Sequence, residues 1–174
     1  PKKFKNKIYL IPALLRKEFY KIKATENTHK EINLLIIGGS QGAKLFDTII
    51  KDSIIDLSKK YKLKIFHQTS IKNYDNLDSF YLKNKIQNKL FNYNEDVFNY
   101  MSVSNICITR AGASTLAELI YLNIPHIAIP LPNAKDNHQY ENASFYQRLG
   151  CNWILNQNEI NNTTEDLTGN ISNI

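Results

Sequence analysis

Residues 106–118 combine residue types that bind an anion with one that binds hydroxyl groups. Ile106–Thr109 is a short apolar run of β-branched residues, typical of the end of a buried strand. In the turn that follows, we expect Gly112 to take a backbone conformation that a Cβ would forbid. A helix then begins at Ala113, and the first N–H groups of a helix lack intrahelical partners and attract anions. Glu118 lies about a turn and a half further on and can accept hydrogen bonds from paired hydroxyls, so the stretch predicts a nucleotide site.

A second glycine-rich turn strengthens this interpretation, because strand–glycine–helix junctions also occur without any ligand. Gly38–Ala43 follows the apolar strand Ile32–Ile37 and precedes a helix with apolar residues as far as Ile54. The turn is similar to the dinucleotide fingerprint without matching its spacing. Strands alternate with helices along the chain, which predicts an α/β fold with a doubly wound parallel, Rossmann-like sheet. The two turns follow the first and fourth strands, so we expect both to face the crevice where strand order reverses.

The other expected elements complete this alternation. We expect further strands at 63–67, 89–93, 103–109, 125–130 and 153–155, and helices at 73–83, through 101, from 113, and through 149 with Gly150 past its end. Residues 1–30 are expected to form a linker with a basic segment, and 31–174 to form one domain.

Composition limits the class of protein. With 174 residues, 43% of them hydrophobic, the chain can bury a core, and no apolar run of 18 or more residues predicts a membrane span. The net charge of +6 is concentrated in the first two dozen residues, which predicts either a solvated surface or contact with an anionic membrane. Nucleic acid is disfavoured because no arginine–glycine–aromatic pattern or zinc spacing accompanies the charge. Cys107 and Cys151 fit reduced thiols of a cytosolic chain, and no signal peptide is visible.

Several motifs together resemble the MurG family. They are Gly-Gly-Ser-Gln-Gly-Ala at 38–43, His-Gln-Thr at 67–69, Arg-Ala-Gly-Ala-Ser-Thr-Leu-Ala-Glu at 110–118, Pro-His-Ile-Ala-Ile-Pro at 125–130 and Lys-Asp-Asn-His-Gln-Tyr-Glu-Asn at 135–142. The resemblance covers about 32–155 and implies the C-terminal, donor-binding half of a two-domain GT-B glycosyltransferase. Such an enzyme transfers GlcNAc from UDP-GlcNAc to undecaprenyl-pyrophosphoryl-MurNAc-pentapeptide in peptidoglycan synthesis. It would be cytoplasmic and peripheral on the inner face of the plasma membrane.

The resemblance also implies the donor-binding residues. Ser40 would lie near the phosphates, the backbone of Asn94 would contact uracil, and Glu118 would bind the ribose hydroxyls. Gln139 would bind the GlcNAc hydroxyls, and Arg16 would reach the diphosphate. The amides for the pyrophosphate would come from the start of the helix, at Ala113, Ser114, Thr115, Leu116 and Ala117.

No cofactor is implied, and the sequence contains no Asp-x-Asp pair for a metal, so helix dipoles and amides are expected to stabilise the UDP leaving group. The catalytic base is unknown, because the acceptor-binding N-terminal half of the family is absent from these residues. We therefore expect the chain to bind donor but not to transfer sugar alone.

Three alternatives remain open. The chain could be a standalone donor-binding subunit that joins a separate acceptor subunit, or a degenerate module that binds a nucleotide sugar without catalysis. A UDP-sugar epimerase shares the fold, but the Gly38–Ala43 turn argues against it.

Overall fold

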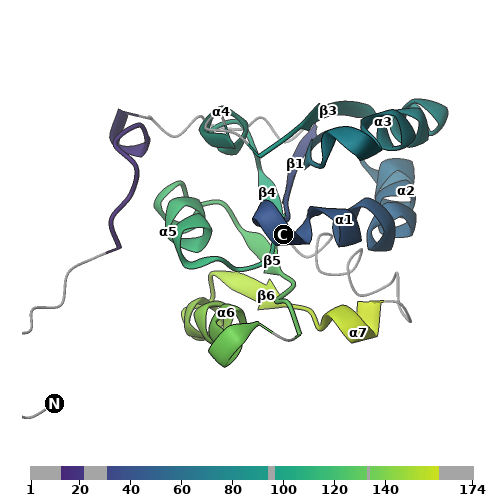
Figure 1. Ribbon diagram of the computed structural model, residues 1–174. Helices are drawn as coiled ribbons and strands as arrows, with labels where there is room; N and C mark the ends of the chain where they lie inside the picture. Colours follow the sequence, from purple (N-terminus) through teal and green to yellow (C-terminus); the bar gives the residue numbers. More distant parts are fainter. Residues whose placement is uncertain (1–12, 22–30, 94–96, 133, 161–174) are drawn as a thin grey trace, which may run out of the picture.

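The chain forms a six-stranded, fully parallel sheet with helices on both faces (Figure 1). The computed structural model describes residues 13–21, 31–93, 97–132 and 134–160. The strand order is β3-β2-β1-β4-β5-β6, so the order reverses between β1 and β4. The strands are β1 (Ile32–Ile37), β2 (Leu63–Gln68), β3 (Gln87–Phe91), β4 (Ile106–Thr109), β5 (His126–Ala128) and β6 (Asn152–Ile154). The predicted doubly wound sheet is confirmed.

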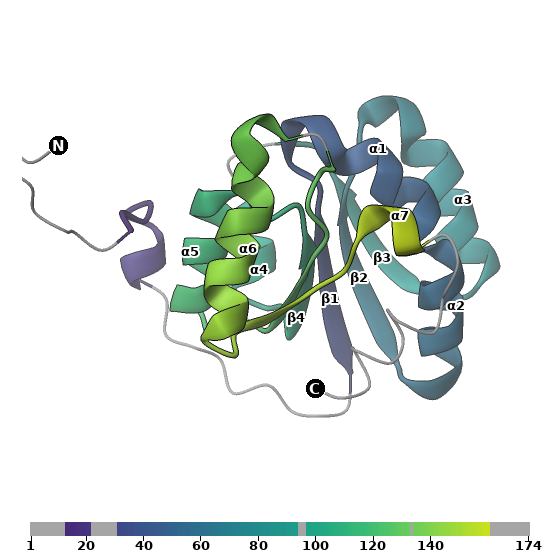
Figure 2. The ribbon, with the colours of Figure 1, turned by 90° about the horizontal axis from the view of Figure 1, so that it is seen from below.

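The helices divide into two layers (Figure 2). One layer contains α1 (Gly39–Ile49), α2 (Lys51–Lys60), α3 (Tyr74–Lys83) and α7 (Gln157–Ile160). The other contains α4 (Val97–Met101), α5 (Ala113–Tyr121) and α6 (His138–Arg148). Short 3-10 helices lie at η2 (Phe19–Lys21), η3 (Ile71–Asn73) and η4 (Lys135–Asn137). Because α1 and α5 leave adjacent strands toward opposite faces, their N-termini meet at the carboxyl edge of the sheet.

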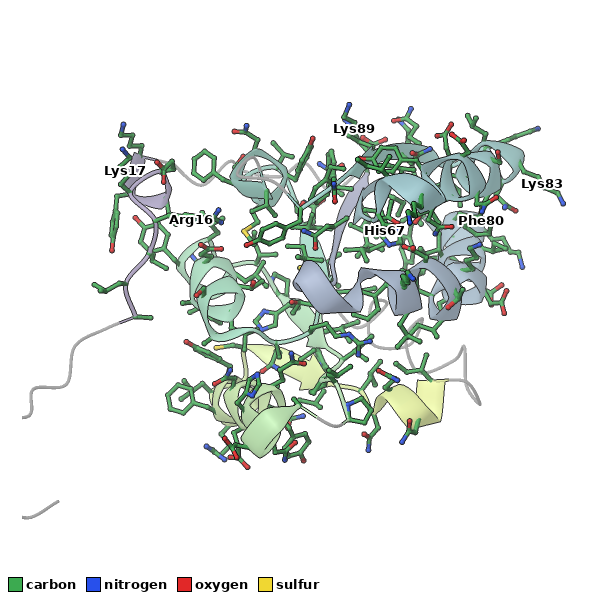
Figure 3. All side chains as sticks on the ribbon, viewed as in Figure 1. Arg16, Lys17, His67, Phe80, Lys83 and Lys89 are labelled. Atoms are coloured by element: carbon green, nitrogen blue, oxygen red, sulfur yellow. The ribbon has the colours of Figure 1, made fainter. Side chains whose placement is uncertain are left out.

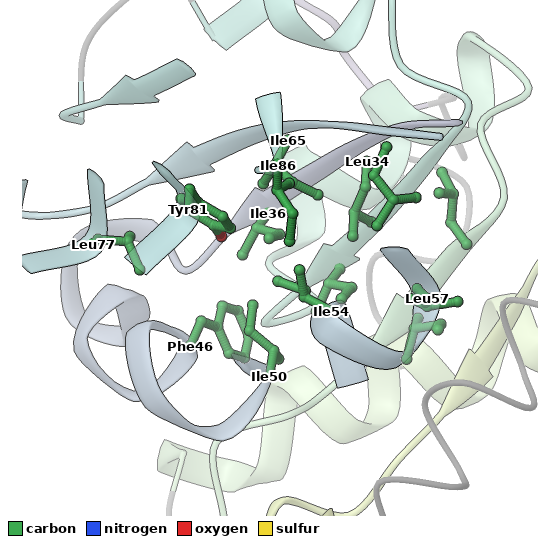
Figure 4. Packing of buried hydrophobic residues seen from close by; sticks show 14 of the residues in the cluster. Leu34, Ile36, Phe46, Ile50, Ile54, Leu57, Ile65, Leu77, Tyr81 and Ile86 are labelled. Atoms are coloured by element: carbon green, nitrogen blue, oxygen red, sulfur yellow. The ribbon is translucent and has the colours of Figure 1, made fainter. Parts of the chain in front are cut away.

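The apolar run in β1 is explained by burial on both of its faces. Leu34 and Ile36 belong to the cluster beneath α1, α2 and α3, where they pack with Phe46 and Ile54 (Figure 4). Leu35 and Ile37 belong to the opposite cluster, beneath α4 and α5. A strand covered on both faces has no polar side to present, which is why its sequence does not alternate.

Several element boundaries differ from the sequence prediction. The expected helix through Ile54 is two helices, with Ile50 between them, and the first begins within the glycine turn at Gly39. The strand expected from 103 begins at Ile106, because Ser104 N–H closes a turn on Met101 O at the end of α4. By contrast, the predicted end of α6 is confirmed. Gly150 has φ +74, and the N–H groups of Gly150 and Cys151 close on carbonyls of the last helical turn.

Residues 13–21, which we expected to belong to a linker, pack against the domain. Phe19 is fully buried in the cluster beneath α4 and α5, and its ring meets Phe98 edge-on at 5.2 Å between centroids. Tyr20 meets Tyr121 of α5 at 5.7 Å in the same manner. The rest of the expected linker, residues 1–12 and 22–30, lies outside the described residues. No helix among the described ranges is both long enough and apolar enough to cross a bilayer.

The burial of Phe19 leads to a stability prediction. Replacing Phe19 with Ala is expected to lower the free energy of unfolding by about 3 kcal/mol, because it removes a ring that no water reaches and leaves a cavity. Urea unfolding followed by circular dichroism measures the change. Tyr20→Ala is the matched control, since Tyr20 is 59% exposed and its loss is expected to cost much less. Equal effects of the two substitutions would contradict the docking of this segment.

Candidate functional site

A cleft of about 320 Å³ opens at the carboxyl ends of β1 and β4, where the strand order reverses. One part of its lining is polar and comes from Arg16, Gly39, Gln68, Ser114, Thr115 and Glu118. The other part is apolar or aromatic and comes from Leu14, Ile37, Tyr93, Val97 and Met101. The start of α1 and the start of α5 therefore line a single cleft, as the sequence predicted. An elongated ligand with an apolar, flat end and an anionic end matches this division.

The turn before α5 reaches its geometry in a way that the sequence did not predict. Gly112 has φ −63 and ψ 137, which any residue can adopt, so the expectation of a special conformation at this glycine is wrong. The left-handed residue is its neighbour Ala111, with φ +60, which is fully buried and whose carbonyl accepts a hydrogen bond from Asn142 Nδ2. Backbone strain at a non-glycine residue persists only where the surroundings impose it, and it often accompanies a binding site.

The amides at the start of α5 divide into free and occupied groups. Leu116 N–H donates to Gly112 O at 3.0 Å and closes the first helical turn, so it is not available to a ligand. The N–H groups of Ala113, Ser114 and Thr115 have no acceptor within the helix. Of the predicted stretch, Ser114 and Thr115 line the cleft, whereas Leu116 and Ala117 are buried in the protein.

Arg16 and Glu118, which are 102 residues apart in the sequence, form a bidentate ion pair in the cleft. Arg16 Nε donates to Glu118 Oε1 at 2.7 Å, and its Nη2 donates to Oε2 at 2.9 Å. The Glu118 side chain is only 6% exposed, whereas that of Arg16 is 41% exposed and lies over the Phe19 ring. Figure 3 shows Arg16 reaching from its segment toward α5. A bidentate pair fixes the carboxylate plane, and each oxygen keeps capacity for a further hydrogen bond.

Gln68 is a cleft residue to which the sequence analysis gave no role. It lies at the end of β2, is 3% exposed, and its Oε1 accepts a hydrogen bond from Gly39 N–H at 2.9 Å. The N-cap residue of α1, Gly38, has no side chain that could accept a hydrogen bond from the first turn of the helix. Gln68, from strand β2, supplies that acceptor instead. The signal in the sequence was its place in the His-Gln-Thr motif at a strand end, where polar residues face a crevice.

Of the remaining predicted residues, Gln139 lies outside the cleft lining, and the Ser40 side chain and Asn94 lie outside the described part of the structure. Gln139, in the first turn of α6, is not part of the cleft lining, and its Oε1 accepts a hydrogen bond from Leu131 N–H at 2.8 Å. The backbone of Ser40 lies in the first turn of α1, but its side chain is outside the described part of the structure. Asn94 lies wholly outside the described residues. Their roles stay predictions.

A buried polar cluster lies on the α1 side of β2, away from the cleft. His67 Nε2 is 3.3 Å from Asp47 Oδ1, and Tyr81 Oη is 2.8 Å from His67 Nδ1. Asp47 Oδ2 accepts hydrogen bonds from Thr69 and Asn73, at 2.8 and 2.6 Å. Figure 3 shows His67 between the sheet and the α1–α3 layer.

The two ionisable partners of this cluster have opposite charge preferences. Burial lowers the pKa of His67 and outweighs the opposing effect of Asp47, so the imidazole stays neutral. Burial would raise the pKa of Asp47, but the neighbouring His67 and the hydrogen bonds from Thr69 and Asn73 bring the pKa below its ordinary value. The cluster therefore consists of a carboxylate held by neutral donors. Within the described ranges, no group of three or more His, Cys, Asp or Glu side chains is arranged to hold a metal ion.

The Glycosyltransferase family 28 C-terminal domain matches residues 33–174. This chain belongs to that family. The family identity agrees with the observed GT-B-type sheet, which has a cleft at the point where strand order reverses.

Curated relatives of the family 28 domain carry one common description. A protein of Pelagibacter ubique is 58% identical over 164 residues, which cover 94% of this chain and 46% of the relative. A protein of Rickettsia canadensis is 38% identical, covering 92% of this chain and 47% of the relative. Both are described as UDP-N-acetylglucosamine–N-acetylmuramyl-(pentapeptide) pyrophosphoryl-undecaprenol N-acetylglucosamine transferases. The chain spans about half the length of these relatives.

Solved structures agree with the family assignment. Acinetobacter baumannii MurG is 29% identical with a TM-score of 0.73, and the match covers 84% of this chain and 42% of that one. A UDP-GlcNAc 2-epimerase from Neisseria meningitidis has a TM-score of 0.53 at 14% identity over 90% of this chain and 38% of that one, which shows a common fold.

The pKa of His67 leads to a pH prediction. Because its pKa in the folded chain is below the reference value of 6.5, the unfolded chain binds more protons as the pH falls below 6.5, and stability decreases. Asp47 acts in the same direction at lower pH, since its stabilisation is lost as the pH falls below 3.8. The charged or titratable groups acting on His67 are Asp47, Lys51 and Tyr81.

Urea unfolding at a series of pH values measures this effect. As the pH falls below 6.5, His67 is expected to contribute a slope of up to about 1.4 kcal/mol per pH unit. His126, whose pKa burial also lowers, adds a contribution of the same sign. His67→Gln should reduce the slope, because it removes the group whose pKa is lowered. A slope unaffected by His67→Gln would show that the imidazole does not stay neutral in the folded chain.

Proposed function

We propose that this chain binds UDP-GlcNAc as the sugar donor of an N-acetylglucosamine transferase that completes the lipid-linked peptidoglycan precursor. The observation that carries the proposal is the single cleft in which two helix starts, a buried carboxylate and an apolar wall come together. Helix starts bind phosphate, a carboxylate with free acceptor capacity binds a diol, and an apolar wall binds a base. The relatives' descriptions supply the identity of the sugar and of the acceptor.

Each part of the donor is assigned to the part of the cleft lining whose chemistry matches it. Uracil is assigned to the part lined by Tyr93, Val97 and Met101. The ribose hydroxyls are assigned to Glu118. The diphosphate is assigned between the two helix starts, where Ser40 belongs to one and the amides of 113–115 form the other.

Two further residues are assigned from their position around the cleft. Arg16 adds a positive charge within the lining, and its Nη1, which the ion pair with Glu118 does not use, can donate to a phosphate while that pair is kept. The sugar is assigned toward the start of α6, where Gln139 keeps its Nε2 as a donor while its Oε1 is bonded to Leu131.

Transfer of the sugar leaves a UDP anion, and the chain's contribution to the reaction is to stabilise that charge. Each helix dipole contributes about 0.3–2 kcal/mol to the binding of an anion near its N-terminus. Two helices therefore help the leaving group depart but do not lower the whole barrier. The acceptor, the catalytic base and the rest of the barrier reduction are assigned to an acceptor-binding half, so the chain alone is expected to bind donor without transfer.

The acceptor is proposed to be undecaprenyl-pyrophosphoryl-MurNAc-pentapeptide, which places the enzyme on the cytoplasmic face of the plasma membrane. The net charge of +6 supports contact with anionic lipid.

Donor binding is the direct test of the proposal. Titration calorimetry of the 174-residue chain with UDP-GlcNAc is expected to give binding that EDTA does not change, because amides and Arg16 neutralise the diphosphate. Addition of a lipid-linked acceptor should give no product. If a folded sample takes up neither UDP nor UDP-GlcNAc, the proposed function is wrong.

The ribose assignment is tested by a cycle between protein and ligand. Glu118→Gln is expected to weaken UDP about tenfold, since a neutral amide accepts hydroxyl hydrogen bonds less strongly. The variant should bind 2′,3′-dideoxy-UDP as the unmodified chain does, because this analogue lacks the diol. Glu31→Gln is the matched control. Glu31 lies just before β1, at the edge of the sheet opposite the cleft, where it pairs with Lys62. Equal losses for UDP and the dideoxy analogue would exclude a diol contact.

A further inference from the structure

The His-Gln-Thr motif at 67–69 contacts helix α1 at two separate points. Gln68 accepts a hydrogen bond from Gly39 N–H at the start of the helix. Thr69 and His67 meet Asp47 in its third turn. The two points are eight residues apart along α1, or about 12 Å at 1.5 Å per residue. Two attachments on one helix fix both its position along the axis and its rotation about it.

The attachment at Asp47 is well suited to hold the helix in one position. Asp47 is 2% exposed, and its carboxylate has His67, Thr69 and Asn73 as neighbours within 3.3 Å. A buried carboxylate that loses its donors carries a large desolvation penalty, so alternative positions of α1 that break these bonds are disfavoured. His67 is itself held from the other side by Tyr81 of α3.

The attachment at Gly39 connects this cluster to the cleft. The side chain of Gln68 is almost fully buried and lines the cleft, and its Oε1 is committed to Gly39. That bond orients the amide so that its Nε2, a donor, points away from Gly39. His67 and Gln68 are consecutive residues of β2, so they face opposite sides of the sheet and link the buried cluster to the cleft through one strand.

We propose that the motif is a positioning element for the donor's diphosphate. His67, Thr69 and Asp47 hold α1 so that its first turn faces the phosphates, and Gln68 sets the orientation of the Gly39 amide. His67, Thr69 and Asp47 are positioning residues that touch no ligand, and their effect reaches only the part of the ligand that α1 contacts. The inference rests on the proposed function, since it concerns the same cleft.

The test compares UDP with uridine, which shares the base and ribose but has no phosphate. Thr69→Val removes one hydroxyl from Asp47 at nearly constant volume and is expected to weaken UDP about tenfold while changing uridine affinity little. Thr69→Ser keeps a hydroxyl and should restore UDP binding. Asp47→Asn should give the larger loss, and Asp56→Asn is its control, because Asp56 pairs with Lys59 on the exposed side of α2. Affinities are measured by NMR titration of the 174-residue chain, with urea unfolding to compare stability.

The outcomes separate the two claims. If the unmodified chain fails to bind UDP, the proposed function is wrong, and so is this inference, which depends on it. If the unmodified chain binds UDP and Thr69→Val weakens UDP and uridine equally, or weakens neither, the motif has no positioning role. If Asp47→Asn does not fold, the comparison of Thr69→Val with Thr69→Ser decides alone.

Discussion

The parallel pairing of β1 with β4 is the constraint on which the rest of the structure depends. Leu34–Ile37 pairs in register with Ile106–Thr109, so the two strands end side by side. The chain leaves β1 into α1 on one face of the sheet and leaves β4 into α5 on the other (Figure 2). Both helices therefore direct unpaired N–H groups at one edge, and the cleft forms between them. Because β1 is buried on both faces, side chains of both helix layers pack against it and hold it at the centre of the sheet.

The two buried carboxylates, Glu118 and Asp47, have different roles in this fold. Glu118 is paired with a cation that is partly exposed, and it lies in the cleft lining, so its remaining acceptor capacity is directed to the cleft. Asp47 is surrounded by neutral donors between α1 and the sheet, so its capacity is used within the protein. The difference follows from position along the helices: Glu118 is one and a half turns from a helix start, whereas Asp47 is deep in the layer between α1 and the sheet. The place of Glu118 suits the binding of a ligand in the cleft, whereas that of Asp47 suits the positioning of α1.

Much of the fold was predictable because it depends on local patterns. The continuous apolar run at Ile32–Ile37, the turns at Gly38 and Gly112, and Gly150 after α6 each predicted an element or its end. The joint location of the two glycine turns was also predictable, since chain order alone places the first and fourth strands next to each other in a doubly wound sheet. Boundaries were less accurate, because the first turn of α1 includes glycine, which local propensity excludes from a helix.

The sequence by itself determined the class of fold, the edge of the sheet that holds the cleft, and Glu118 as its acid. Only the tertiary structure decided that Ala111, not Gly112, takes the left-handed conformation, because the surrounding packing imposes that strain. It also decided that Arg16 pairs with Glu118 across 102 residues and that Gln68 caps α1 from another strand. These contacts join segments whose separation in the chain carries no periodic signal. Their partners are fixed by the docking of Phe19 and by the register of β2, which are properties of the folded chain alone.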